Sequence, residues 1–422
     1  MPITEPTATC SHEPTLDIYY RPEMAVDNDP VGNYSRSPSK PRRFMEYLSK
    51  TTLVPFIEVR DFAPLSREDF VLAHTPDYVD AFFAGRSPLS RSNGLTWSSE
   101  FADTVRYTNG SLVAAVDAAL GNPARVALSP TSGFHHARPS GGAGFCTFSG
   151  QVIAAVRAWR ERGARGAWID LDGHFGNSIE DSREYVAELA FAIPLGCNLN
   201  PEGRGRDYLA ELERGLADIG ARVLAGELDY VAFAHGADSH VDDDLYGQCD
   251  THEWLVASHM VYGAVRAWSR ALGRPVPLVL ALFGGYRADS SDSVLELHAS
   301  DCAIALRVLS GADVWHTPRV VRKGVVSWMD LATRIPAHIP EQVRTKRLLE
   351  VGFDADSGSS GGHVHHFDPA APLEEGLVVL EKYGRTMNAG HLRFDDRTSI
   401  RLTRGGGFER YDAEPQAAIG TR

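Results

Sequence analysis

Four short apolar runs constrain the fold of this chain more than any other feature. They are "RVALSP", "GAWIDLD", "DYVAFAHGAD" and "PLVLALFGGY", and they begin at residues 125, 166, 229 and 277. Each run has the length of a strand, is apolar at consecutive positions, and is separated from the next by residues with a helical pattern. Strands of a parallel sheet that is covered on both faces have this composition. We therefore predict an α/β fold with a central, mostly parallel sheet flanked by helices on both faces.

The segments around these runs have their own patterns. "TNGSLVAAVDAALGNP" predicts a helix that is closed by Gly121 and Pro123, and "GQVIAAVRAWRERG" predicts a second helix that stops at Gly163. Residues 1–15 are expected to form a loose tail. Residues 28–43 are rich in Pro, Ser and basic side chains and predict an irregular loop.

The last hundred residues differ from the rest, and we predict a domain over residues 1–318 followed by a C-terminal extension over 319–422. "ADSGSSGGHVHH" is rich in Gly and Ser and predicts a mobile loop or linker. Its His363, His365 and His366 are a conceivable second metal site, but the surrounding glycines and serines favour a flexible loop. "SIRLTRGGGFERYDA" predicts a hairpin around three glycines.

Composition excludes several classes of protein. A net charge of −13 argues against a chain that wraps nucleic acid or lies on an anionic membrane. The N-terminus shows no signal-peptide pattern, and no stretch approaches 18 apolar residues. The five cysteines are odd in number, have no CxxC spacing and predict neither a disulfide framework nor a Cys-zinc site: Cys10, Cys146, Cys197, Cys249 and Cys302. A reducing cytoplasm is the expected location.

Polar and glycine-rich residues follow each apolar run at its carboxyl end. They are "TSGFHHARPSGGAGF", "DGHFGN", "GADSHVDDD" and "GGYRADSS". In open α/β sheets, ligands bind in the crevice outside the carboxyl ends of the strands. Four independent runs thus place their chemically active residues on one edge of the predicted sheet.

A metal site is the favoured interpretation of one of these clusters. Asp170, Asp172 and His174 are spaced two residues apart, so a strand would turn them to one face. Two carboxylates on a buried face are reasonable only if a cation lies among them. With Asp238 from the neighbouring run, a carboxylate–imidazole–carboxylate set with an open position would suit a catalytic zinc. The alternatives are a capped strand end for the first cluster and a helix N-cap or turn residue for Asp238.

Further candidates surround this predicted metal site. His135 and His136 are adjacent in a glycine-rich loop, where imidazoles are suitable proton carriers; two ordinary loop histidines are the alternative. Tyr286 follows two glycines, which would free its phenol to point into the crevice; a core or edge tyrosine is the alternative. The run Asp242–Asp244 is interpreted as a solvated charge run and cap, not as a ligand set.

The combination of these blocks resembles the histone deacetylase family, which includes bacterial deacetylases and acetylpolyamine amidohydrolases. Four blocks match in order: "GFHHARPSGGAGFC", "IDLDGHFGN", "AHGADSHVDDDLYG" and "LFGGY". "HTPDYVDAF" and "SPSKPRR" match more weakly. The resemblance covers roughly residues 16–315, and four blocks in order are highly specific. It implies a zinc-dependent amidohydrolase on the arginase/deacetylase fold.

The resemblance also implies roles for individual residues. Asp172, His174 and Asp238 would be the zinc ligands. His135 and His136 would be the two active-site histidines, with His136 as general base and later general acid.

Supporting roles follow in the same way. Asp170 would orient His135 and balance its charge, and Asn177 stands where the partner of His136 is expected. Tyr286 would polarise the amide carbonyl. Gly144 and Phe145 would line a narrow acyl-lysine channel.

The chain departs from the family pattern in two places. Family members often have a second histidine after the zinc-binding one, whereas this chain has Phe175. The segment between Asn177 and Asp238 is short, and the usual strand and Gly-rich loop with a second channel Phe are not recognisable. A potassium ion near Asp170 and one wall of the channel are therefore uncertain.

Three functions remain open at this point. The favoured one is hydrolysis of an acylated amine, with protein acetyl-lysine, an acetylated polyamine or a small metabolite as substrate. A dimanganese ureohydrolase shares the fold but would need further carboxylates in both metal blocks. A binding protein that has lost turnover is supported by the short segment alone. Nucleic-acid and membrane partners are not expected, and a homo-oligomer is compatible with the sequence.

Overall fold

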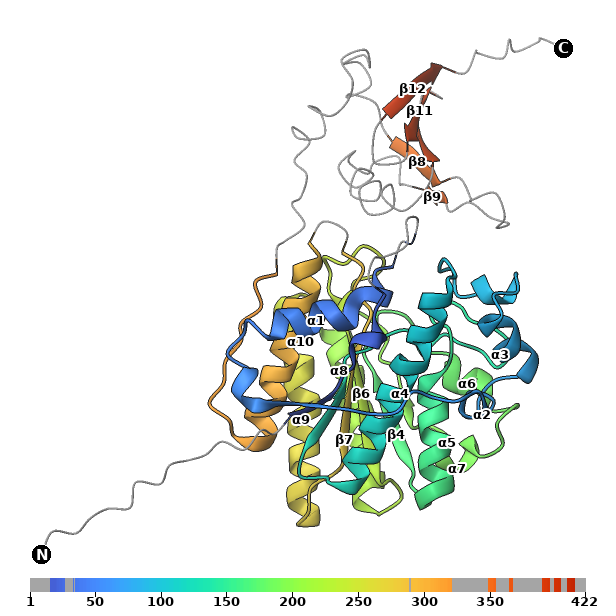
Figure 1. The fold of residues 1–422 in the computed structure, drawn as a ribbon. Coiled ribbons are helices and arrows are strands. Elements are labelled where there is room, and N and C mark those ends of the chain that lie inside the picture. The colour runs from blue at the N-terminus through green and yellow to red at the C-terminus, as the bar shows by residue number, and fades with distance from the viewer. Residues whose placement is uncertain are drawn as a thin grey trace, which may run out of the picture. The chain divides into compact units, whose positions relative to one another are not determined.

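The computed structural model describes residues 16–26, 33, 35–287 and 290–320, together with the backbone of five strands between residues 348 and 413. The chain divides into two compact units, Met1–Val321 and Arg322–Arg422 (Figure 1). The division at residues 318 and 319 stays a prediction, and the predicted tail over residues 1–15 lies outside the described residues.

The first unit contains a seven-stranded sheet in which every neighbouring pair is parallel, in the order β2-β1-β3-β7-β6-β4-β5. The strands are β1 (Leu16–Tyr19), β2 (Ile57–Arg60), β3 (Val126–Ser129), β4 (Gly166–Asp170), β5 (Asn198–Leu199), β6 (Tyr230–Gly236) and β7 (Leu278–Phe283). All four predicted runs are strands of this sheet, which confirms the predicted fold class.

The central strands carry the core of this unit. Every residue of β4, β6 and β7 is buried, as the unbroken apolar runs predict for strands covered on both faces. Asp170 pairs with Ala234 across β4 and β6, and Gly236 pairs with Phe283 across β6 and β7. This register brings the carboxyl ends of the central strands, and the loops that follow them, to one edge.

The long helices form two groups, and the sheet runs between them (Figure 1). Contacts join α4 (Ser99–Gly121) to α5 (Gly150–Arg162), and they join α9 (Thr251–Leu272) to both α8 (Arg206–Leu224) and α10 (Ser291–Ala305). The shorter helices are α1 (Lys40–Leu48), α2 (Arg67–Phe70), α3 (Pro76–Phe83), α6 (Ser178–Ser182) and α7 (Leu189–Ala192), and a π-helical turn over Leu306–Ser310 follows α10. None of the described helices has the length and apolar content needed to cross a membrane.

Helix ends follow local chemistry. Helix α5 ends at Gly163 in the left-handed conformation, as predicted, because glycine carries no Cβ to clash there. Helix α4 ends at Gly121 but begins earlier than its apolar pattern indicates, because the Ser98 side chain accepts the Phe101 N–H as an N-cap.

The predicted irregular loop over residues 28–43 is wrong at its C-terminal end. A 3-10 turn spans Ser37–Ser39, and α1 begins at Lys40. Each element carries a proline in its first two positions, where the missing N–H costs nothing and the fixed φ favours a helix. Proline therefore lies at the start of helical elements here, although its abundance in the sequence predicts an irregular loop. Residues 27–32 and 34 lie outside the described residues.

The second unit contains an antiparallel sheet in the order β12-β11-β10-β8-β9. Its strands are β8 (Leu348–Phe353), β9 (Val364–His366), β10 (Ala389–Phe394), β11 (Thr398–Thr403) and β12 (Phe408–Ala413). The antiparallel pairing of β11 with β12 confirms the predicted hairpin. The loop predicted over residues 355–366 is wrong for Val364–His366, which pairs with β8, and the preceding residues lie outside the described ones.

A buried carboxylate joins three elements of the first unit. Asp301 on α10 accepts hydrogen bonds from Ser258 Oγ (2.6 Å) and Tyr262 OH (2.7 Å) on α9. Its Oδ1 also lies 3.2 Å from Nδ1 of His235 on β6. The Asp301 side chain is almost fully buried, so water could not take its place as the acceptor for these groups.

Removal of this carboxylate is expected to destabilise the fold. Asp301→Ala leaves buried donors without an acceptor and should lower the free energy of unfolding by about 3 kcal/mol. Asp218→Ala is the matched control, because Asp218 is an exposed residue on α8. Denaturant unfolding measures both. Equal stability of the two variants would contradict the proposed role of Asp301.

Candidate active site

The loops after four parallel strands bring most of the predicted site residues together. His135 and His136 lie in the loop after β3, and Asp172 and His174 follow β4. Asp238 lies in a 3-10 turn, Ala237–Ser239, directly after β6. Tyr286 follows β7 by three residues. The shared edge of the sheet was predicted from the four runs.

Asp172, His174 and Asp238 form a compact cluster. Their ligand atoms lie within 4.8 Å of one another. His174 Nδ1 lies 3.2 Å from Asp172 Oδ1 and 2.9 Å from Asp238 Oδ2. Both carboxylates are buried, whereas the imidazole is one-third exposed and forms the open side of the cluster.

The electrostatics of this cluster call for a positive charge. Burial and the neighbouring Asp172 carboxylate raise the pKa of Asp238 to about 8. Burial opposes charge on His174, but the two carboxylates outweigh it and raise its pKa to about 11. The negative charge of the cluster therefore favours bound protons on His174 and Asp238, and a divalent cation would neutralise the same charge. One imidazole and two carboxylates suit zinc in type and number, with one position left for water or substrate.

Glycine permits the close packing behind this cluster. Gly284 has φ +52°, and a Cβ at this position would overlap the Asp238 carboxylate. A Cβ at Gly236 would likewise overlap the backbone of Asp172. The strand ends can therefore approach the carboxylates of Asp172 and Asp238 only because both positions lack a side chain.

The two histidines have different partners. His135 Nδ1 donates to Asp170 Oδ2 at 2.9 Å, and His136 Nδ1 donates to Asn177 Oδ1 at 2.8 Å. Burial opposes charge on His135, but Asp172 and Asp170 outweigh it and raise its pKa to about 9. Burial and the charge on His135 lower the pKa of His136 to about 4. At neutral pH the pair therefore holds one cationic and one neutral imidazole.

Aromatic rings border the cluster. The rings of Phe145 and Tyr286 lie 5.6 Å apart, and Tyr286 lies 6.5 Å from the His174 ring. Burial and the carboxylates of Asp172 and Asp238 raise the pKa of the Tyr286 phenol well above its usual value, so it remains a hydrogen-bond donor. A Cβ at Gly144 would overlap the His136 ring, so this glycine lets the Phe145 loop pack against the histidine.

Lys40 is a part of the site that sequence reasoning missed. Its ammonium is buried and donates to the carbonyl oxygens of Leu282 (3.3 Å) and Gly284. Burial lowers its pKa to about 8, although Asp238 and Asp172 act in the opposite direction. A lysine in a basic, proline-rich segment resembles an exposed residue, and the weak "SPSKPRR" match was the one available signal.

The interpretation of Asp242–Asp244 as a solvated charge run is wrong. Asp243 and Asp244 are each only 1% exposed. Asp243 accepts hydrogen bonds from the backbone N–H groups of Leu245 (2.9 Å) and Tyr286 (2.7 Å). These bonds pull the loop inward and fix the backbone that carries Tyr286.

The loop after Asp244 supplies another aromatic wall that the sequence did not reveal. The ring of Tyr246 lies 5.1 Å from the His174 ring. Phe175, which replaces the family's second histidine, is instead half-exposed. Tyr246 therefore packs beside the imidazole of His174.

The short segment after Asn177 contains more structure than predicted. Helices α6 and α7 lead to the short strand β5, and Asn200 Oδ1 accepts the Gly176 N–H at 2.7 Å. The segment therefore contains a strand, but this strand is only two residues long. Both oxygens of Asp170 accept hydrogen bonds, from His135 and from the Asp172 N–H (3.1 Å), and the potassium ion near Asp170 stays a prediction.

Comparisons with known proteins show that the chain is similar in sequence to histone deacetylases. Residues 34–192 match the histone deacetylase domain. The chain is 25% identical over 289 residues to "Histone deacetylase 10, chloroplastic" of Oryza sativa subsp. japonica, covering 59% of this chain and 63% of that relative. It is 30% identical over 159 residues to "Histone deacetylase-like amidohydrolase" of Pseudomonas aeruginosa, covering 36% and 40%.

A solved structure gives the same result for the fold. The "Crystal Structure of HDA15 HD domain" matches with a TM-score of 0.53 and 17% identity, covering 72% of this chain and 90% of that chain. The chain spans less than two-thirds of the length of the rice relative. The resemblance that the motifs carry is confirmed by these matches.

Substitution of Gly284 is expected to weaken metal binding. Gly284→Ala places a methyl group against Asp238 and should weaken Zn²⁺ binding at least about 100-fold, because a ligand carboxylate must move. Gly311→Ala is the matched control: Gly311 also has a positive φ (+74°), but nothing lies within 4 Å of its Cβ position. Metal content after dialysis measures the effect. Tight binding by a folded Gly284→Ala variant would contradict the assigned triad.

Proposed function

Because the chain resembles the histone deacetylase family in its motifs, matched domain and fold, we propose that it hydrolyses an acylated amine in a zinc-dependent reaction. The substrate would be an acetyl-lysine or acetylpolyamine-like linear amide, and the products a free amine and a carboxylate. One observation carries this proposal. A triad suited to zinc lies beside two histidines of opposite protonation and a protonated phenol, all on one edge of the sheet.

The triad of Asp172, His174 and Asp238 would hold the metal, which when bound supplies Lewis acidity toward water and an amide carbonyl oxygen. His136 is neutral near pH 7, so it can accept the proton of the attacking water. Tyr286 donates a hydrogen bond to the carbonyl oxygen as that oxygen gains negative charge. His136 in its protonated form then delivers the proton to the leaving amine.

The surrounding residues set up this chemistry. Asp172 and the hydrogen-bonded Asp170 raise the pKa of His135, and burial together with the charge on His135 lowers the pKa of His136. Asn177 fixes the His136 ring through Nδ1 without adding charge, which leaves Nε2 to exchange protons. Phe145 and Tyr246 flank the cluster with aromatic surface that suits the methylene chain of an acyl-lysine or a polyamine.

The alternatives receive less support. A dimanganese ureohydrolase needs carboxylates that bridge two ions, and the described residues contain the single triad above. A binding protein without turnover would not require the complete set of triad, histidine pair and phenol. The chain's four described cysteines are free and buried, which suits the reducing cytoplasm that we propose as its location.

The function is tested by a substrate screen on the full chain loaded with zinc. Acetyl-lysine peptides, acetylpolyamines and small amides are assayed for release of acetate, with the bound metal quantified in the same sample. Tyr286→Phe should lower kcat about 100-fold or more, because the donor to the developing oxyanion is lost.

Tyr107→Phe makes the same chemical change away from the site and should retain activity. Absence of turnover on every substrate by the zinc-loaded protein would overturn the proposal. Two manganese ions per chain would favour the ureohydrolase.

The partner of His136 is expected to control the pH dependence. His136 acts as a base in its neutral form, so activity is lost as pH falls through its pKa. Asn177→Asp places a carboxylate 2.8 Å from Nδ1 and should raise that pKa by about 1–3 units. The acidic limb of kcat/KM should therefore move to higher pH.

Rate measurements between about pH 3 and 9 test this expectation, because the range includes the His136 pKa of about 4. Asn122→Asp, at the exposed C-cap of α4, adds the same charge elsewhere and should leave the profile in place. An acidic limb that does not move in Asn177→Asp would remove His136 from the role of base.

A further inference from the structure

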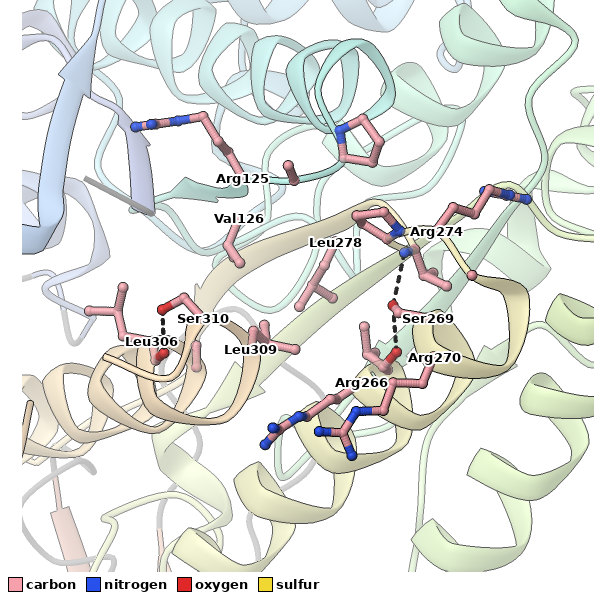
Figure 2. A pocket seen from close by; sticks show the side chains of 17 residues that line it. Arg125, Val126, Arg266, Ser269, Arg270, Arg274, Leu278, Leu306, Leu309 and Ser310 are labelled. Atoms are coloured by element: carbon pink, nitrogen blue, oxygen red, sulfur yellow. Dashed lines mark hydrogen bonds between the residues drawn. The ribbon is translucent and has the colours of Figure 1, made fainter. Parts of the chain in front are cut away.

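A cavity of about 540 Å³ lies at the opposite edge of the sheet from the candidate active site (Figure 2). Its walls come from the amino ends of β3 and β7, the C-terminal end of α9, and the turn after α10. Strand β7 begins at this cavity with Leu278 and ends beside the active site with Phe283. We propose that the cavity binds a small amphipathic anion, in which a carboxylate or phosphate head is attached to an apolar chain.

The floor of the cavity is apolar. Val126, Leu278, Leu306 and Leu309 line it, together with Val265 of α9 (Figure 2). This surface would exclude a fully hydrated ion but would favour a hydrocarbon chain, because burial of apolar surface is favourable.

The polar side chains of the wall are already satisfied. Ser269 Oγ donates to the Val265 carbonyl oxygen at 2.8 Å and accepts the Val276 N–H at 2.9 Å. Ser310 Oγ donates to the Leu306 carbonyl oxygen at 2.5 Å. Neither hydroxyl needs a ligand, so the wall presents mainly carbon to the cavity.

Arginines provide the charge. Arg266, Arg270 and Arg274 line the cavity, and each is exposed. Arg266 and Arg270 lie one turn apart on α9, so they occupy the same face of the helix. None of the three forms an ion pair with a carboxylate in the part of the chain that the structure describes. The fourth lining arginine, Arg125, is instead paired with Asp17 and Glu58.

The charge balance of the wall is opposite to that of the chain. None of the seventeen lining residues is acidic, although the whole chain carries a net charge of −13. Guanidinium groups bind carboxylates and phosphates through paired, charge-assisted hydrogen bonds. Arg266 and Arg270 therefore offer two cationic groups to an anion on one side of the cavity, whereas the Arg274 side chain extends in a different direction (Figure 2).

Capping of α9 does not account for these arginines. The helix ends at Gly273 in the left-handed conformation. The Gly273 and Arg274 backbone N–H groups already bind the carbonyl oxygens of Arg270 and Ser269, both at 3.2 Å. Two of the last four carbonyls of α9, those of Ser269 and Arg270, thus have main-chain partners and do not need the guanidinium groups.

The shape of the cavity favours a small molecule over a macromolecule. Its volume falls within the range of about 300–1,000 Å³ that ligand pockets occupy. A concave, apolar floor with cations at its exposed side suits one molecule with a tail and a single head group. Decanoate and decyl phosphate represent the two head groups with the same tail.

Calorimetric titration of the full chain with these two probes tests the proposal. At least one of them should bind saturably, and decan-1-ol should bind at least about tenfold more weakly because it lacks the charge. The triple variant Arg266→Gln/Arg270→Gln/Arg274→Gln should weaken binding of the anionic probe at least about tenfold. The stronger probe identifies the head group.

A matched triple variant separates the local effect from the change in net charge. Arg162→Gln/Arg204→Gln/Arg206→Gln removes three exposed arginines elsewhere and should leave binding unchanged. Absence of binding by both anionic probes would overturn the proposal. So would equal binding of decan-1-ol, or equal loss in the two triple variants. Because all substituted arginines are exposed, the variants are expected to fold, and circular dichroism verifies this.

Discussion

The burial of two carboxylates, Asp172 and Asp238, at the ends of adjacent strands is the interaction on which the rest of the site depends. Negative charge in the interior is costly unless positive charge or hydrogen bonds compensate it. Here three basic side chains provide the compensation, because both carboxylates act to raise the pKa values of His174, His135 and Lys40. The same demand that favours a metal ion at the triad also sets the protonation of its neighbours.

This electrostatic arrangement produces a division of labour between the two histidines. His135 lies close to the carboxylates, with Nε2 3.7 Å from Asp172 Oδ1, and carries the charge. His136 faces the neutral Asn177, and burial together with the charge on His135 lowers its pKa. A base and a fixed cation thus arise from identical side chains, because their partners differ by one charge.

The geometry depends equally on residues that have no chemistry of their own. The parallel register aligns the ends of β4, β6 and β7, and Gly236 and Gly284 let those ends approach the carboxylates. Lys40 donates to the carbonyl oxygens of Leu282 and Gly284 at the end of β7, and Asp243 accepts the Tyr286 N–H. The backbone before and at Tyr286 is therefore fixed by hydrogen bonds, which suits the role as hydrogen-bond donor that we propose for its phenol.

Much of this arrangement could be predicted from the sequence because strand length, apolar runs and residue spacing are local signals. The four central strands and the shared edge follow from such patterns, whereas the choice of Asp172, His174 and Asp238 as the triad came from the family resemblance. Lys40 and Asp243 could not be recognised, because their burial depends on segments distant in sequence and their neighbours suggest exposed loops. The start of α1 was missed for a related reason, since proline marks both loops and first helical turns.

The two edges of the sheet follow different rules, and this difference explains why the sequence revealed only one of them. At the carboxyl edge, loops after consecutive strands gather unusual residues into short motifs, so the site is visible in the chain as clusters. At the amino edge, the cavity is lined by a helix end, two strand starts and a distant turn, and its arginines are spaced four residues apart like those of any exposed helix. Only the folded arrangement sets these arginines above an apolar floor in a chain of opposite net charge. Sites of this second type are assembled by tertiary packing, so they leave no motif and must be found from the structure.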